Sequence, residues 1–146
     1  GFNTPRWSFY SLYATCCEPP PPPPPEECRE PVEFWTAADP STWPTTCEWP
    51  VCWSAELGSV WDDEVMAIEA SDLWTALSQE YIAAKENSVC YPANCVIRAA
   101  ISRTGYLIND CEIDETEQAE AEELLALFHA FNTGAYNVTE EEACWQ

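Results

Sequence analysis

Apolar residues recur at helical spacing through the second half of the chain, between Trp61 and Gly134. A short helix is predicted first, because Asp62, Asp63 and Glu64 place negative charge where a helix N-terminus favours it. It carries Val65, Met66 and Ile68. Ser71 then predicts the N-cap of a longer helix that ends near Glu86 to Ser88. The apolar face of this helix consists of Leu73, Trp74, Leu77, Tyr81 and Ala84.

Two more helices are predicted further along. One begins after Pro92 and is stopped by Gly105, with Val96, Ile97, Ala100 and Ile101 pointing inward. The other starts at a capping-box-like pair, Asp114 and Glu117, and ends at Gly134. Its apolar stripe is Ala121, Leu124, Leu125, Phe128 and Phe131. Thr139 and Glu142 could cap one final turn before Cys144.

The stretch from Glu30 to Val60 alternates prolines with tryptophans, and we expect it to be irregular because proline on this spacing prevents a helix. The prolines are Pro31, Pro40, Pro44 and Pro50, and the tryptophans are Trp35, Trp43, Trp49 and Trp53. We interpret the tryptophans as residues that pack in the core and under its loops rather than as a ligand cage. A sugar-stacking role for one exposed tryptophan remains open.

The first fifteen residues form an aromatic arm. If the arm is extended, both of its faces are apolar, so it needs a surface to bury against. It either folds back over its own domain or inserts into a neighbouring subunit, and we favour the neighbour. The predicted interface residues are Phe2, Trp7, Phe9, Tyr10, Leu12 and Tyr13.

Seven consecutive prolines follow the arm and predict a polyproline II rod of about 22 Å. The rod is either a bare spacer or, in a secreted protein, a hydroxylated and O-glycosylated segment. Its residues are Pro19, Pro20, Pro21, Pro22, Pro23, Pro24 and Pro25. We therefore expect an arm at 1–15, a Cys/Pro-rich linker at 16–31 and a domain at 32–146. The predicted class is a mainly α, small, disulfide-stabilised helical domain with long irregular Trp/Pro-rich loops.

The chain is strongly acidic, with a formal net charge of −21 over 146 residues. Such a charge repels phosphate backbones and anionic lipids, so we expect neither nucleic acid nor membrane as a partner. No apolar run approaches the ~20 residues of a membrane span. Because the chain starts at Gly1 without a leader, we expect a mature secreted protein. The acid excess favours a solvated surface, with calcium or high salt as alternatives, although no EF-hand loop is present.

The chain has nine cysteines: Cys16, Cys17, Cys28, Cys47, Cys52, Cys90, Cys95, Cys111 and Cys144. With a single histidine and no C-x-x-C, they predict disulfides and an oxidising, extracellular compartment rather than zinc. Cys47 with Cys52, and Cys90 with Cys95, could close small local loops. The odd cysteine is either free or bonded to another chain, and the Cys16–Cys17 pair is the first place to look.

No pattern of residues predicts an enzyme. His129 is the only histidine, and a lone histidine without a placed nucleophile is usually structural or exposed. The sequence contains no nucleophile elbow, zincin motif, phosphate loop or dinucleotide fingerprint. We therefore predict no catalytic residues, no cofactor and no metal ligand.

Several motifs resemble a secreted domain known from bacteria and algae. They are Phe34-Trp35, Trp43-Pro44, Leu57-Gly58-Ser59-Val60, the stretch Leu77-Ser78-Gln79-Glu80-Tyr81-Ile82-Ala83-Ala84-Lys85-Glu86-Asn87, and Phe131-Asn132-Thr133-Gly134 followed by Cys144. The resemblance covers roughly Cys28 to Cys144 and implies an extracellular or cell-surface module without an established activity. The polar residues that follow the tryptophan in that domain are replaced here by Thr36, Ala37 and Ala38. Any site that they form is therefore expected to be absent.

The function that we expect is structural: an extracellular subunit of a helical fibril or surface appendage, assembled head to tail through its arm. Its partners would be copies of itself, with glycans on the prolines and on Asn137 in the sequon Asn137-Val138-Thr139. An interchain disulfide through the ninth cysteine could lock the polymer. The alternative is a monomeric extracellular module on a proline-rich stalk that binds carbohydrate or calcium.

Overall fold

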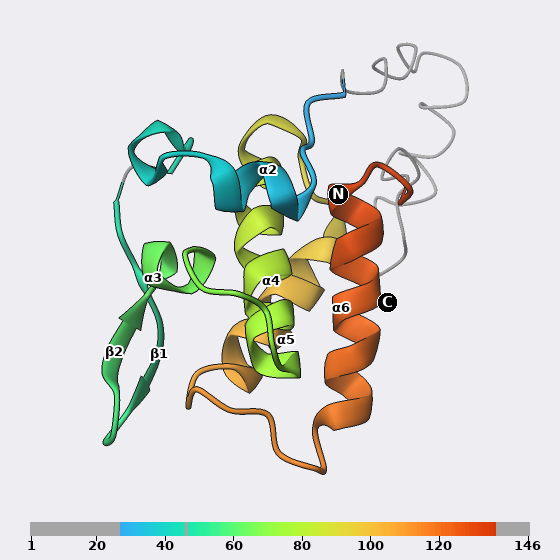
Figure 1. The fold of residues 1–146 in the computed structure, drawn as a ribbon. Helices are drawn as coiled ribbons and strands as arrows, with labels where there is room; N and C mark the ends of the chain where they lie inside the picture. The colour runs from blue at the N-terminus through green and yellow to red at the C-terminus, as the bar shows by residue number, and fades with distance from the viewer. Residues whose placement is uncertain (1–26, 46, 137–146) are drawn as a thin grey trace, which may run out of the picture.

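A computed structural model describes residues 27–45 and 47–136, and this part of the chain is a mainly α, disulfide-containing domain. Its central pair is α4 (Leu73–Cys90) and α6 (Gln118–Asn132), which lie side by side, with α5 (Cys95–Leu107) packed against both (Figure 1). Before them come α2 (Val32–Ala37), the 3₁₀ helix η1 (Pro40–Thr42), the strands β1 (Pro50–Ser54) and β2 (Gly58–Trp61), and α3 (Asp62–Met66).

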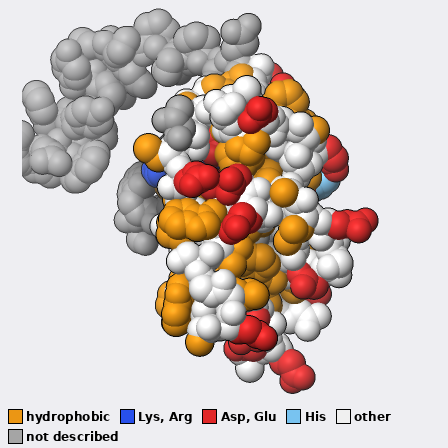
Figure 2. Space-filling view, turned by 60° about the vertical axis from the view of Figure 1, so that its left-hand side comes forward, with side chains coloured by type: hydrophobic (Ala, Val, Ile, Leu, Met, Phe, Trp, Pro, Cys, Tyr) orange, Lys and Arg blue, Asp and Glu red, His pale blue; other side chains and the backbone are white. Residues whose placement is uncertain are grey.

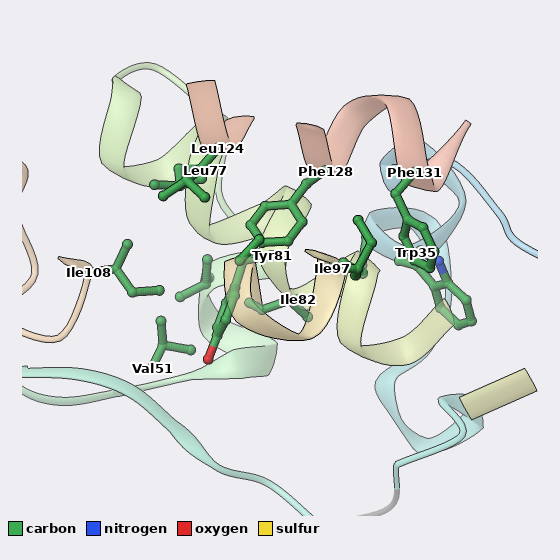
Figure 3. Close-up of a cluster of buried hydrophobic side chains, with 14 of the residues drawn as sticks. Trp35, Val51, Leu77, Tyr81, Ile82, Ile97, Ile108, Leu124, Phe128 and Phe131 are labelled. Atoms are coloured by element: carbon green, nitrogen blue, oxygen red, sulfur yellow. The ribbon is translucent and has the colours of Figure 1, made fainter. Parts of the chain in front are cut away.

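Helix α4 is the centre of the core. Eleven of its eighteen residues are buried, because α2, α3, α5 and α6 all pack against it. Leu77 and Ile82 are fully buried there, and Phe128 and Phe131 enter the same core from α6, with Phe128 against Tyr81 (Figure 3). Six of these eleven buried residues are polar: Thr75, Ser78, Gln79, Glu80, Glu86 and Asn87. The single apolar face predicted from the sequence is therefore only part of the buried surface of α4.

The ends of α4 and α5 differ from the prediction. Asp72, not Ser71, caps α4, since its Oδ1 accepts a hydrogen bond from the Thr75 N–H at 2.8 Å. Asn94 caps α5 in the same way. Gly105 does not stop α5 but lies inside it, where an added Cβ would be 3.1 Å from the hydroxyl oxygen of Tyr81. This glycine makes room for a tyrosine of the neighbouring helix.

The start and end of α6 are close to the prediction. Asp114 Oδ1 accepts from the Glu117 N–H at 3.0 Å, and the Asp114 N–H donates to Glu117 Oε1 at 3.2 Å. This reciprocal pair closes the turn immediately before the helix. Gly134, with φ of +83°, follows the last turn, in the left-handed conformation that glycine adopts without strain.

The expectation that residues 30–60 are irregular is wrong in part. Pro31 stands immediately before α2 and Pro40 at the start of η1, positions where proline needs no N–H. A β-hairpin then pairs Cys52 with Val60 and Trp53 with Ser59. Its turn leads into Gly58, whose φ is +70°. Pro31, Pro40 and Pro50 therefore mark where these short elements begin, and only Pro44 lies between elements.

The disulfides join distant parts of the chain. Cys28 is bonded to Cys90 and Cys52 to Cys111, across sequence separations of 62 and 59 residues. The two small local loops considered from the sequence are therefore wrong. Cys95 is also disulfide-bonded, whereas Cys47, which was expected to be in a disulfide, has a free and exposed thiol. Cys16, Cys17 and Cys144 lie outside the described residues.

Arg29 anchors the first described residues of the chain to the domain. The Arg29 guanidinium lies 3.7 Å from the centre of the Tyr91 ring and donates to the Tyr136 carbonyl at 2.8 Å. Its side chain is almost completely buried and pairs with Glu27 at 2.7 Å. Residues 28–30 fall in the range expected to be linker, yet they are bonded to the domain at the C-terminal end of α4.

Candidate functional site

A groove of about 420 Å³ lies between α4 and α6. Small and aliphatic side chains make up much of its lining, and carboxylates, an amide and an imidazole make up the rest. The lining residues are Val32, Ala70, Ala76, Gln79, Glu80, Glu122, Leu125, Ala126 and His129. Neither lysine nor arginine is among them. The groove therefore suits an apolar group that carries positive charge.

Glu80 and His129, which both line this groove, are hydrogen-bonded to each other. The Nδ1 atom of His129 is 3.0 Å from Oε2 of Glu80. The Glu80 side chain is only 9% exposed, whereas that of His129 is 60% exposed. The buried carboxylate therefore holds the exposed ring in one orientation at the margin of the groove. The sequence analysis quoted Glu80 within a motif but did not predict it as a site residue, because nothing in the local pattern distinguishes it from the other carboxylates of the chain.

Buried asparagine side chains hold Glu80 in place through hydrogen bonds. Asn132 Nδ2 donates to Glu80 Oε1 at 2.8 Å, and Asn87 Nδ2 donates to Asn132 Oδ1 at 2.8 Å. Asn87 Oδ1 in turn accepts from the Glu30 N–H at 2.8 Å and from Trp35 Nε1 at 3.2 Å. We call this hydrogen-bond network of Trp35, Asn87, Asn132 and Glu80 the relay. It runs from Glu30, through α4 and α6, to the groove. Because each of these amides is partnered, their burial is compensated.

Three of the five motifs that were quoted for the resemblance contribute to this relay. Trp35, Asn87 and Asn132 come from three separate motifs and meet in this one network. Within the helical motif, Ile82, Ala83 and Ala84 are fully buried. Lys85 lies 3.9 Å from the centre of the Trp49 ring, and burial lowers the pKa of its amine. These positions of the motifs have structural roles.

An acidic cluster, Glu48, Asp62 and Asp63, lies beside the free Cys47 and lines a small notch with it. Burial raises the pKa of Asp62, and repulsion by Asp63 raises the pKa of Glu48. Among residues 27–45 and 47–136, no group of three or more His, Cys, Asp or Glu side chains is placed to hold a metal ion.

We expect Asp62→Asn to stabilise the domain at neutral pH. A carboxyl whose pKa is raised in the folded state binds its proton more tightly there, so its stabilising effect is present at low pH and is lost as pH rises through the raised pKa. The amide stays neutral and keeps an oxygen that can accept the Asp63 N–H, as Oδ1 does now at 2.9 Å. The melting temperature should rise at pH 7 and match the wild type near pH 3. Glu33→Gln, at an exposed carboxylate, is the control, and a lower melting temperature of the Asp62 variant at pH 7 would contradict the prediction.

The tryptophans do not all serve the core. Trp35 and Trp43 are buried as expected, but Trp53 is 60% exposed and Trp61 36% exposed, on the same hairpin. The face of the molecule in Figure 2 shows hydrophobic side chains interspersed with many carboxylates. The sequence analysis considered a sugar-stacking role for one exposed tryptophan but did not predict which tryptophan is exposed.

The remaining predicted site residues lie outside the described part of the chain. They are the aromatic residues of the arm, the seven prolines and Asn137. No helix of the described segments is long and apolar enough to cross a membrane. Comparisons with protein-family models, with curated proteins and with solved structures found no match.

Proposed function

We propose that this protein is an extracellular structural subunit that polymerises head to tail into a fibril or surface appendage. In the proposed contact, the aromatic arm of one subunit occupies the α4–α6 groove of the next. The observation that supports this most is the groove itself, which is open, largely apolar and bordered by carboxylates. Disulfides that span 62 and 59 residues are compatible with the oxidising compartment that the proposal requires.

The arm complements the groove in charge and in polarity. Residues 1–15 contain Arg6 and no acidic residue, and Arg6 is followed directly by Trp7. We place the indole of Trp7 over the small side chains of the groove and the guanidinium near Glu122, which is exposed. Charge-assisted hydrogen bonds of arginine to carboxylates are stronger than neutral ones. Anionic ligands, by contrast, would be repelled.

The contact joins two different surfaces, so it does not close on itself. The chain enters the domain at Arg29, beside Tyr91 at the end of α4, whereas the groove lies along the first half of α4 and its neighbours. Repetition of such a contact generates a helical polymer. The aromatic residues of the arm would together bury on the order of 1,000 Å², which is enough for a specific interface.

Filling the groove tests this proposal. Ala126→Trp places an indole in the groove from an exposed position of α6, and Ala119→Trp places one on the same helix away from the groove. We expect deletion of residues 1–13 and Ala126→Trp each to leave monomers, while Ala119→Trp polymerises like the wild type. Electron microscopy and light scattering of non-reduced protein measure this. The mass of the native subunit, compared with 16.5 kDa for the bare chain, reports glycans.

A charge exchange identifies the register of the arm. Arg6→Glu should prevent polymerisation, and Glu122→Arg in the same chain should restore it, since the attractive pair is re-formed with its charges reversed. Polymers that persist after deletion of residues 1–13 would overturn the proposal. Uniform wild-type monomers at the bare mass would overturn both the polymer and its glycan coat.

A further inference from the structure

We infer that the β-hairpin carries a second site, distinct from the α4–α6 groove, which binds a neutral carbohydrate chain. The site combines a platform of exposed tryptophans on the outer face of the hairpin with an adjoining groove of about 460 Å³. This inference is independent of the proposed function, because it uses other residues on another part of the surface.

The register of the hairpin places both exposed indoles on one face. Trp53 is paired with Ser59, and Trp61 lies two residues beyond Ser59 on the same strand. Side chains at alternate positions share a face, and such diagonal neighbours lie about 7–8 Å apart, within reach of aromatic rings. The opposite face is turned inward, where Cys52 is buried and bonded to Cys111. The platform is therefore held on the domain by a disulfide.

The groove adjoins the platform at Ser59, which is paired with Trp53, while Val60 and Cys111 line the groove from the inward side of the hairpin. The groove runs from the hairpin turn towards the start of α4 and has both apolar and polar walls. It is lined by Leu57, Ser59, Val60, Glu64, Ile68, Asp72, Trp74, Thr75 and Cys111. Leu57 is 62% and Ile68 51% exposed, so these apolar walls are open to a ligand.

The polar groups of the groove are two carboxylates, which accept hydrogen bonds, and the hydroxyls of Ser59 and Thr75, which can donate or accept. Glu64 Oε1 accepts from the Trp61 N–H at 2.9 Å, and Asp72 Oδ1 accepts from the Thr75 N–H at 2.8 Å. Each carboxylate has a second oxygen to which the described residues donate no hydrogen bond. No cationic side chain lines the groove. An anionic ligand would therefore be repelled, whereas hydroxyl groups on an uncharged backbone can donate to the carboxylates and accept from the hydroxyls of the groove.

The area available favours a carbohydrate over a protein. Trp53, Leu57, Trp61 and Ile68 together expose on the order of 400 Å² of side chain, about half of the roughly 800 Å² that each partner buries in a standard protein interface. A pyranose ring is flat, with C–H groups that stack on an indole and hydroxyl groups around its rim. In this proposal the tryptophan platform stacks on the C–H groups of the ring, and the polar groups of the groove bind its hydroxyl groups. A pre-formed site lowers the entropic cost of binding.

Affinity electrophoresis of the full chain tests the inference. Native gels would contain hydroxyethyl cellulose, galactomannan or soluble starch as neutral polymers, and polygalacturonate as the anionic one. We expect at least one neutral polymer to retard the protein and polygalacturonate not to. Trp53→Ala with Trp61→Ala should weaken the interaction at least about tenfold, as for aromatic side chains that become buried on binding. Phe34→Ala, at an exposed aromatic on α2, is the matched control.

The remaining outcomes are equally decisive. Absence of retardation by all three neutral polymers would overturn the inference, as would retardation that the double tryptophan variant leaves unchanged. Retardation by polygalacturonate alone would show that the charge argument is wrong. Ala126→Trp, which blocks the other groove, should leave retardation unchanged, so that failure of the polymer proposal and failure of this one are separable. Circular dichroism of each variant checks that it is folded.

Discussion

Replacing Asn87 by leucine should destabilise the domain by about 4 kcal/mol, although the two side chains branch at the same atom and have the same number of non-hydrogen atoms. The substitution leaves the Glu30 N–H and Asn132 Oδ1 without a partner in a buried environment. Each buried group that loses its hydrogen bond costs roughly 1–3 kcal/mol. Urea unfolding followed by tryptophan fluorescence measures the loss.

The matched control is Asn109→Leu, at an exposed position, which should change stability by less than about 0.5 kcal/mol. Combining Asn87→Leu with Asn132→Leu should cost less than the sum of the single changes, because both remove the same Asn87–Asn132 hydrogen bond. Strict additivity, or a loss below about 1 kcal/mol for Asn87→Leu alone, would show that the relay does not stabilise the fold.

Truncating Phe128 to alanine should cost a similar amount, about 4 kcal/mol, for a different reason. Phe128 is fully buried and its ring lies 6.2 Å, centre to centre, from Tyr81 across the α4–α6 contact (Figure 3). Phe→Ala substitutions in a core lose both the transfer free energy and the packing around the cavity that remains. The shift in the urea midpoint at unchanged slope measures it.

Tyr106→Ala is the control for this variant, because Tyr106 is 65% exposed on α5. It should leave the midpoint nearly unchanged. A loss below about 1 kcal/mol for Phe128→Ala would mean that α4 and α6 can close over the cavity. The α4–α6 groove would then be expected to deform as well, so assembly assays on Phe128→Ala would report on the rigidity that docking of the arm requires.

The periodicity of the sequence was sufficient to locate the helices from residue 61 onward. Apolar residues at helical spacing, acidic first turns and Gly134 are local signals, and they act within a few residues of where they stand. Gly105 shows the limit of such signals. Its role is set by the Tyr81 hydroxyl on another helix, so a residue that normally ends helices lies inside one.

The sequence by itself determined that this chain has an acidic, disulfide-containing, mainly helical domain, preceded by an aromatic arm and a run of prolines. Only the tertiary structure decided which cysteines pair, since Cys28 meets Cys90 through the packing of distant segments. It also decided that Trp35, Asn87, Asn132 and Glu80 form one relay to a groove, and that Trp53 faces solvent. Contacts between residues far apart in the chain depend on how whole elements pack, and local patterns carry little information about that packing.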